Sequence, residues 1–423
     1  MELTVEKLIY GGDGLARLPA DERGRGKAVF LPFVLEGERV EAARVEEKPG
    51  FARARVERVI LPSPRRTEPA CPYYTQCGGC HYQHAAYEHQ LAVKAGILRE
   101  TLRRTARVEL PGEITIHPSP PWNYRNRTRL RLQANPFALG YYRLNSHRLL
   151  AVEQCPISSP LINRAIGVLW ELGRAGKIAA GLEEIELFAD AEDRRLLVEL
   201  YATAEAEPPQ AAADQLAAAL PEVAGVACFR GRDPESRPQV LAGEGALTYA
   251  TRRASYRVSA GSFFQTNRHL TDELVEVVTA GRSGVTALDL YAGAGLFSTV
   301  LAGSFERVLA VESGAPAYAD LKHNVPATVK CARATTREFL ERKTRSAADL
   351  VVVDPPRAGL GESVVQLLGR LTAPRLTYVS CDPATLSRDL RGLLELNFKV
   401  EQVHLVDLFP QTFHIESVLH LVR

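Results

Sequence analysis

The residue of this chain best suited to covalent chemistry is a cysteine at the end of an apolar run. The run Leu376–Val379 predicts a buried strand that delivers Cys381, and Pro383 then stops the strand and opens a helix. In open α/β sheets, ligands meet catalytic groups at such strand ends. Most free cysteines are inert packing residues, but a cysteine in this position is a candidate nucleophile.

A second group of cysteines has the spacing of a metal site. Three thiols fall within ten residues of one another: Cys71, Cys77 and Cys80. Gly78–Gly79 lets the backbone fold back, and we expect Cys155 to be the fourth ligand, because Cys228 and Cys331 lie in core-like patterns. Four thiolates suit a [4Fe-4S] cluster, which we expect, or a structural zinc ion. Because a cysteine set is complete, two nearby histidines are less favoured ligands: His81 and His84.

The strongest local excess of positive charge lies in residues 121–148, which contain six arginines and no acidic residue. Four of these alternate, so a strand would place their guanidinium groups on one face: Arg125, Arg127, Arg129 and Arg131. Aromatic residues are interleaved with them. Arginines that pair phosphates beside rings that stack bases make a nucleic-acid surface, which we expect here. A solvated face is the alternative, although like charges repel unless a polyanion or an acidic partner relieves them.

The composition sets the class of protein. The chain has 423 residues, 24% charged and 46% hydrophobic, which predicts about two to four domains. We find no stretch that would span a bilayer and no signal-peptide pattern, so a cytoplasmic location is the default expectation. With a net charge of only +2, an anionic partner must meet a local patch. Seven cysteines, an odd number, favour metal binding and catalysis over a secreted disulfide framework.

Three structural units must position these residues. Residues 1–60 predict a small β-barrel, because short strand-like runs alternate with glycine turns such as Gly11–Gly14. Residues 61–255 predict a central α+β domain that contains the four cysteines and the arginine strand. Residues 256–423 alternate strand and helix patterns to the end, which predicts an α/β domain with a parallel sheet.

The C-terminal unit has the pattern of a nucleoside-binding site. A buried strand, a Gly-x-Gly turn and a helix start follow one another in residues 287–298, and the next strand ends in Glu312, where an acid hydrogen-bonds ribose hydroxyls. A dinucleotide is the rival ligand, but Ser298 replaces the third glycine of that fingerprint. A third strand ends in Asp354–Pro356, which is typical of adenine amino-methyltransferases, although Arg357 in place of an aromatic residue argues against them.

Five segments together resemble the S-adenosylmethionine-dependent RNA uracil-C5 methyltransferases. They are Ser262–Asn267, Asp289–Gly295, Asp354–Gly359, Ser380–Asp389 and Phe409–Glu416. Residues 1–60 resemble a TRAM domain, an OB-like barrel of RNA-modifying enzymes, which implies contact with RNA. The resemblance covers essentially the whole chain and implies that the last domain is a Rossmann-like class I methyltransferase domain.

The resemblance also implies roles for single residues. The residues that would bind S-adenosylmethionine are Gln265, Tyr291, Glu312 and Asp354. Cys381 would be the nucleophile and Glu416 the base, while Leu296 and Thr335 depart from the family pattern. The implied substrate is RNA, with 23S ribosomal RNA favoured over transfer RNA because a TRAM-like domain and four cysteines occur together. We expect a monomer.

The reaction needs these groups because uracil C5 is too weak a nucleophile to accept a methyl group unaided. A thiolate that adds to C6 raises the electron density at C5, and a base must then remove the C5 proton. Asp382, Asp407 and His414 are weaker candidates for this base than Glu416. The target base must leave its stack to reach a buried thiolate. Because methyl transfer from a sulfonium moves no net electrons, we expect the cluster to have a structural and RNA-positioning role.

Two other classes of protein are considered. An RNA cytosine-C5 methyltransferase shares the thiolate chemistry, but its family typically has a Pro-Cys nucleophile motif, and the chain contains no Pro-Cys dipeptide. A non-catalytic RNA-binding iron-sulfur protein would not need Cys381, so substitution of this residue would leave its function unchanged.

Overall fold

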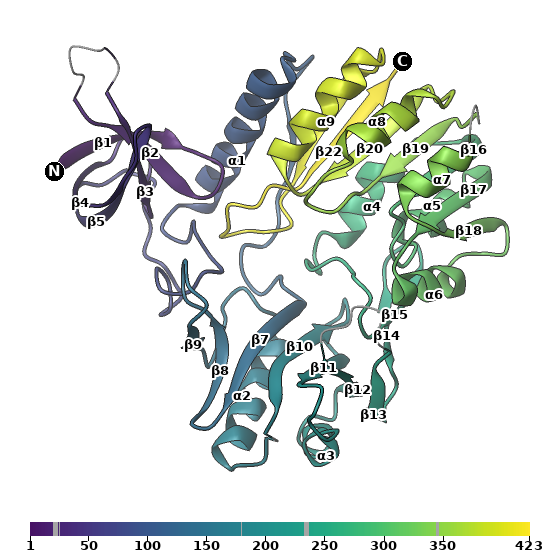
Figure 1. Ribbon diagram of the computed structural model, residues 1–423, viewed down its shortest axis with the longest axis horizontal. Helices are drawn as coiled ribbons and strands as arrows, with labels where there is room; N and C mark the ends of the chain where they lie inside the picture. The colour runs from purple at the N-terminus through teal and green to yellow at the C-terminus, as the bar shows by residue number, and fades with distance from the viewer. Residues whose placement is uncertain (20–23, 25, 179, 232–236, 344–346) are drawn as a thin grey trace.

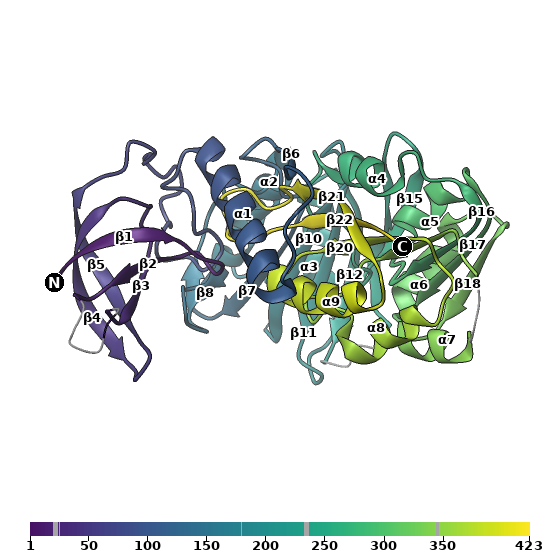
Figure 2. The same cartoon turned by 90° about the horizontal axis from the view of Figure 1, so that it is seen from above.

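The computed structural model describes residues 1–19, 24, 26–178, 180–231, 237–343 and 347–423. Three sheet-based units share the chain: the barrel and the C-terminal sheet occupy opposite ends of the long axis, and the central sheet lies between and below them (Figure 1). The view from above shows the same order (Figure 2). Among the described residues, no helix combines the length and apolarity that crossing a bilayer requires.

Five N-terminal strands close into a barrel, as the sequence predicts. They are β1 (Glu2–Leu8), β2 (Asp13–Arg17), β3 (Ala28–Pro32), β4 (Arg39–Glu47) and β5 (Phe51–Leu61), in the order β1-β2-β3-β5-β4. Successive side chains of a strand point to opposite faces, and in β1 the buried Leu3 and Val5 alternate with exposed residues. The turn between β1 and β2 reaches the C-terminal unit, where Tyr10 contacts Asp382.

The central unit is a seven-stranded sheet in the order β13-β12-β11-β10-β7-β8-β9. Its strands are β7 (Arg127–Ala134), β8 (Phe137–Tyr142), β9 (Leu149–Ala151), β10 (Leu182–Ala189), β11 (Leu196–Ala202), β12 (Val223–Arg230) and β13 (Gln239–Gly243). The helices α2 (Pro160–Arg174) and α3 (Gln210–Ala219) share one core with this sheet. The start of α2 follows helix-capping rules, because Ser159 accepts a hydrogen bond from the backbone nitrogen of Ile162 and Pro160 is the first helical residue.

The C-terminal unit is an eight-stranded sheet in the order β18-β17-β16-β19-β20-β22-β21-β6. Its strands are β6 (Thr115–His117), β16 (Gly284–Leu290), β17 (Phe305–Glu312), β18 (Val329–Arg333), β19 (Leu350–Val353), β20 (Arg375–Ser380), β21 (Lys399–Val406) and β22 (Ser417–Val422). Neighbouring strands are parallel except at β22, which is antiparallel to both β20 and β21.

Helices cover both faces of this sheet, which is the arrangement expected of a doubly wound α/β domain. One core contains residues of α4 (Thr271–Thr279), α5 (Leu296–Leu301) and α6 (Ala315–Asn324). The other core contains residues of α7 (Thr336–Arg342), α8 (Gly361–Gly369) and α9 (Pro383–Glu395). The hairpin β14 (Ala246–Ala250) and β15 (Ser255–Ser259) packs with the first core.

Residues 87–117 pack with the C-terminal unit, although the sequence analysis places them in the central domain. The helix α1 (Tyr87–Thr101) and the following turn η1 (Leu102–Ala106) contribute Ile97, Leu98 and Leu102 to the core of α8 and α9. The strand β6 pairs with β21 at the edge of the sheet. The chain therefore begins the C-terminal unit, leaves it to build the central unit, and returns to complete it.

Candidate active site

Strand direction brings the candidate nucleophile and base together. Cys381 follows the last residue of β20, and Glu416 precedes the first residue of β22. Because these strands are antiparallel and Ser380 pairs with Ser417, Cys381 and Glu416 meet at one edge of the sheet. Asp354 follows β19, which is parallel to β20 and therefore ends at the same edge.

Cys381 lies half-buried at the junction of β20 and α9. The helix begins at Pro383, as the sequence predicts, and Asp382 is its cap. One carboxylate oxygen of Asp382 accepts hydrogen bonds from the backbone nitrogens of Ala384 and Thr385, each at 2.9 Å. The cap fixes the backbone directly after the thiol, so the position of Cys381 follows from local sequence.

Burial and neighbouring acidic groups raise the pKa of three groups at this edge: Cys381, Glu416 and Asp354. Burial, and then the charges of Glu416 and Asp354, raise the pKa of the Cys381 thiol to about 12. Burial and Asp354 raise the pKa of Glu416 well above its usual value, and burial with Asp289 raises that of Asp354 to about 7. Arg357 opposes the shifts of Cys381 and Glu416. A cation bound nearby would favour the ionised forms of these groups.

The turn after β16 meets the end of β17, as the nucleoside pattern predicts. The carboxylate of Glu312 accepts hydrogen bonds from the backbone nitrogens of Gly293, at 2.9 Å, and Gly314, at 2.6 Å. Gly295 has a φ of 93° and Tyr291 a φ of 66°. These left-handed conformations form a tight turn that lets a ligand approach the main chain closely.

The structure also places Gln265, a proposed cofactor contact, and the two residues that depart from the family pattern. Gln265 is buried in the loop between β15 and α4. Thr335, one of the two departures from the family pattern, caps α7 by accepting a hydrogen bond from the backbone nitrogen of Glu338 at 3.2 Å. Leu296, the other departure, is the buried first residue of α5. The cofactor roles given to individual residues stay predictions.

Three of the four cysteines predicted to bind metal share one small core. Cys71, Cys80 and Cys155 pack with neighbours that include Tyr74, Tyr124 and Ile157. Burial raises the pKa of Cys71, Cys77 and Cys80, and the charge of Cys155 raises each of them further. In the described ranges, however, no three Cys, His, Asp or Glu side chains form a group that could hold a metal ion. The cysteines are electrostatic neighbours, and metal binding stays a prediction.

Three of the four predicted arginines lie on β7, which begins after Arg125, and their charge is relieved within the protein. β7 pairs with β10, where Glu184 lies opposite Arg131 and Glu186 opposite Arg129. Arg129 Nε donates to Glu186 Oε2 at 2.6 Å, and Arg131 forms an ion pair with Glu184. The acidic partner that a row of arginines requires is therefore the next strand of the sheet. The alternating glutamates of residues 182–189 were the available signal, but neither strand alone reveals this pairing.

The expectation that all four arginines are available to bind RNA is wrong for Arg127. Its side chain is buried, forms an ion pair with Glu186 and donates from Nη2 to Glu199 Oε1 at 3.1 Å. It serves the fold because a buried guanidinium needs carboxylate partners to offset its lost hydration. RNA contact stays a prediction for the other three: Arg125, Arg129 and Arg131.

The barrel presents a basic, aromatic group to solvent. The guanidinium of Arg53 lies over the rings of Phe30 and Phe51, at 5.9 and 6.0 Å from their centroids. Both rings are partly exposed. Such rings can stack bases, and RNA contact through the barrel, implied by the TRAM resemblance, stays a prediction.

Two further groups border the site: Tyr10, whose contact with this edge had no signal in the sequence, and His414, which the sequence offered as a weaker candidate for the base. The hydroxyl of Tyr10, in the barrel, donates to Asp382 Oδ2 at 3.1 Å, and its ring packs edge-on against Phe413 with centroids 5.6 Å apart. Burial lowers the pKa of His414 to about 3, so its ring is neutral, and it lies 3.3 Å from Nη2 of Arg357. The barrel therefore contributes directly to the edge of the site.

Comparisons with known proteins show which family the chain is similar to. A family model described as tRNA (Uracil-5-)-methyltransferase matches residues 86–423. An uncharacterized RNA methyltransferase of Aquifex aeolicus is 34% identical over 99% of this chain and 97% of its own length. The 23S rRNA (uracil(1939)-C(5))-methyltransferase RlmD of Pectobacterium atrosepticum is 31% identical over 99% of this chain and 92% of its own length.

A solved structure shares the fold over its whole length. It is the tRNA (uracil-54, C5)-methyltransferase of Pyrococcus abyssi in complex with S-adenosyl-L-homocysteine. It matches this chain with a TM-score of 0.77 and 24% sequence identity, and the match covers 100% of both chains.

Proposed function

This chain belongs to the S-adenosylmethionine-dependent RNA uracil-C5 methyltransferases, and we propose that it methylates a specific uridine through a covalent adduct formed by Cys381. The meeting of Cys381, Asp354 and Glu416 at one sheet edge is the observation that supports this most. The favoured substrate is 23S ribosomal RNA, because RlmD, named for a 23S rRNA uridine, is 31% identical over almost the whole chain. Transfer RNA is the second candidate.

The proposed reaction uses two side chains in turn. The Cys381 thiolate adds to C6 of uracil, and the electron pair of the C5–C6 double bond moves to C5. Bound S-adenosylmethionine supplies the methyl group that C5 accepts. Glu416 then takes the C5 proton, the electron pair left behind re-forms the C5–C6 double bond, and the bond between Sγ and C6 breaks.

The charge of the site fits this methyl donor. Because burial and neighbouring carboxylates raise the pKa of both Cys381 and Glu416, a nearby positive charge stabilises their ionised forms. The sulfonium of the donor has such a charge. The donor would be held by four residues: Gln265, Tyr291, Glu312 and Asp354.

The rate of methyl transfer is expected to rise with pH. Addition to C6 needs the thiolate, and the pKa of Cys381 is raised to about 12 in the free protein. Below that pKa the thiolate fraction grows about tenfold per pH unit, and the raised pKa of Glu416 adds to the same trend. We expect kcat/KM for RNA to increase from pH 6 to pH 9 at constant RNA affinity, measured in the same buffers. A flat or falling profile would contradict a thiol that is protonated at rest.

We propose that Cys71, Cys77, Cys80 and Cys155 hold a [4Fe-4S] cluster. A [4Fe-4S] cluster takes four thiolates, and the thiols of Cys77 and Cys80 both lie within electrostatic reach of Cys71 and Cys155. Its role would be structural, because Tyr124 of the same core donates to the carbonyl of Pro410 at 2.9 Å.

Metal content tests this assignment. Protein purified without oxygen is expected to contain iron and sulfide in equal amounts, about four of each per chain. A Cys155→Ser variant should lose part of this iron, while Cys228→Ser, whose thiol lies in the core of the central sheet, should keep all of it. Stoichiometric zinc without iron would show that the cysteines form a zinc site instead.

Methylation of separate RNA samples tests the proposed function. The protein is incubated with a radiolabelled methyl donor and either 23S ribosomal RNA or transfer RNA, and the labelled nucleoside is then identified. Label in 5-methyluridine from one RNA is the expected result, and it names the substrate class. Label in 5-methylcytidine would indicate a cytosine-C5 methyltransferase, and absence of label in both RNAs would favour a non-catalytic RNA-binding protein.

A further inference from the structure

The loop between β21 and β22, residues 407–416, is irregular in structure but fixed by contacts from outside. Gln411 adopts a φ of 67°, which persists in a non-glycine residue only when its surroundings hold it. Phe413, His414 and Glu416 lie in the second half of this β21–β22 loop and border the site. The contacts that hold the first half therefore determine the surroundings of Glu416.

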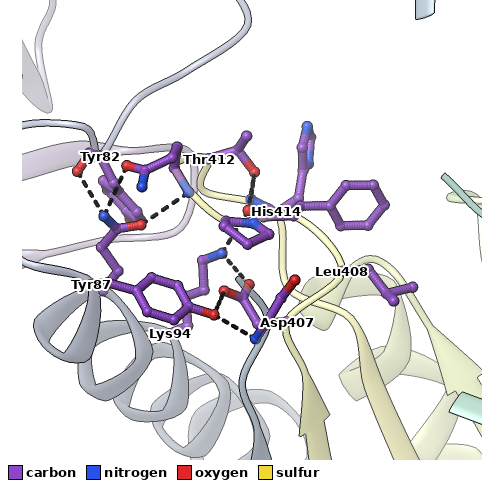
Figure 3. A network of polar contacts seen from close by, with 12 residues as sticks. Tyr82, Tyr87, Lys94, Asp407, Leu408, Thr412 and His414 are labelled. Atoms are coloured by element: carbon purple, nitrogen blue, oxygen red, sulfur yellow. Dashed lines mark hydrogen bonds and ion pairs between the residues drawn. The ribbon is translucent and has the colours of Figure 1, made fainter. Parts of the chain in front are cut away.

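Three polar side chains on one face of α1 hold this loop. Tyr87, Gln90 and Lys94 are three and four residues apart, so they share a face of the helix. Figure 3 shows Tyr87 and Lys94 pointing from α1 towards Asp407. Lys94 Nζ donates to Asp407 Oδ1 at 2.6 Å, and the hydroxyl of Tyr87 donates to Asp407 Oδ2 at 2.9 Å.

The same three side chains, the α1 row, also fix the backbone of the loop. Lys94 Nζ donates to the carbonyl of Phe409 at 2.9 Å. The amide of Gln90 accepts from the backbone nitrogen of Gln411 and donates to its side-chain oxygen, each at 3.0 Å. Alternate residues of the loop, 407, 409 and 411, are thus bound to α1.

The buried ion pair between Lys94 and Asp407 suits a role in positioning the β21–β22 loop better than a role in stability alone. Lys94 and Asp407 are almost completely buried, and burial lowers the pKa of Lys94 while Asp407 opposes that shift. A buried ion pair stabilises a fold no better than well-packed apolar side chains of similar volume. It does, however, impose directions on its hydrogen bonds, which an apolar contact cannot do.

We propose that Tyr87, Gln90 and Lys94 are positioning residues for the elimination step, in which Glu416 takes the C5 proton. This proposal rests on the proposed function, because it needs Glu416 to be the base. In that step the C5–H electron pair re-forms the C5–C6 double bond, and the bond between Sγ and C6 breaks. A loosened loop admits water to Glu416 and displaces its carboxylate, so the proton is removed slowly.

The addition step has a separate support. Cys381 is held by β20 and by the Asp382 cap of α9, and no residue of the α1 row forms a hydrogen bond to either in the described ranges. Weakening the row therefore affects elimination more than addition. The expected result is a covalent complex between the protein and methylated RNA. It should form at the normal rate and break down slowly.

Two variants test this split: Tyr87→Phe, which removes one oxygen atom, and Gln90→Met, which keeps the length of the side chain. We expect kcat to fall by about 10- to 100-fold, the effect of misplacing a catalytic group by about 1 Å, and KM for RNA to fall in proportion, because the steps up to methyl transfer keep their rates. The covalent complex should accumulate as a band that resists SDS. With RNA that contains 5-fluorouridine, which has no C5 proton to lose, both variants should form the adduct as fast as the unaltered protein.

A matched control lies on the same helix. Arg99 is on α1, its side chain is 42% exposed, and its Nη2 lies 2.7 Å from Glu113 Oε2. Because this ion pair does not contact the β21–β22 loop, Arg99→Gln should retain normal kcat and accumulate no complex. A Glu416→Gln variant should accumulate the complex if Glu416 is the base.

The outcomes separate the two hypotheses. If folded Tyr87→Phe and Gln90→Met proteins have normal kcat, or if they lose adduct formation on 5-fluorouridine RNA, the positioning role is wrong. If Glu416→Gln accumulates no complex, the assignment of the base fails instead. Circular dichroism and melting curves establish folding, and if Gln90→Met does not fold, the result for Tyr87→Phe decides.

Discussion

Alanine in place of Cys381 is expected to reduce methyl transfer to RNA by about 10⁴- to 10⁶-fold, the range observed when an enzyme loses its covalent nucleophile. Without the thiolate, no adduct forms at C6 and C5 keeps the low nucleophilicity of uracil. Binding of the methyl donor should be retained, because the substitution leaves all four of its predicted contacts in place. Initial rates with labelled donor and calorimetric titration of the donor measure the two properties.

Cys331→Ala is the matched control for this prediction. Cys331 lies half-buried on β18, at the far edge of the same sheet from β6. The variant should methylate RNA at the normal rate, since its thiol does not border the site. If Cys381→Ala retained a tenth of the normal rate, covalent catalysis by this residue would be ruled out.

Glutamine in place of Glu416 is expected to reduce turnover by about 10²- to 10⁴-fold, the usual contribution of a general base. The substitution preserves side-chain size but removes the carboxylate that accepts the C5 proton. It also removes a charge that raises the pKa of Cys381, so addition to C6 should proceed at least as readily. The protein should therefore accumulate as a covalent complex with RNA that already contains the new methyl group, seen by gel electrophoresis and mass spectrometry.

Glu395→Gln provides the control, because the Glu395 side chain is 68% exposed at the end of α9. Normal turnover of the Glu416→Gln variant would mean that another acidic residue near the site is the base. The structure makes these poor bases: Asp382 caps α9, and Asp407 is paired with Lys94. A covalent complex without the methyl group would place the block before methyl transfer and would contradict the role given to Glu416.

Features whose signal lies within one segment could be predicted from the sequence. The apolar run Leu376–Val379 and Pro383 gave β20 and the start of α9, because strand burial and helix initiation depend on neighbouring residues. The Gly-x-Gly turn and Glu312 likewise marked two adjacent strand ends, since parallel strands bring their carboxyl ends to one edge. The strand ends that form the candidate site were therefore predictable before the structure was known.

Features that depend on distant pairing could not be predicted in this way. Arg127 and Glu199 are 72 residues apart, and only the order of strands in the central sheet brings them together. Tyr10 and Asp382 are 372 residues apart and belong to different units. The placement of α1 against β21 and α9 also has no local signal. The sequence pattern of an amphipathic helix does not specify which part of the protein the helix packs against.

The insertion of the central unit between α1 and the rest of the C-terminal sheet has a consequence for biosynthesis. Lys94 is translated 313 residues before its partner Asp407. At about 5 to 20 residues per second, the nascent chain must wait about 15 to 60 s for the loop that α1 binds. Tyr87, Gln90 and Lys94 can stay hydrated during this interval, whereas an apolar row would expose an aggregation-prone surface beside the ribosome.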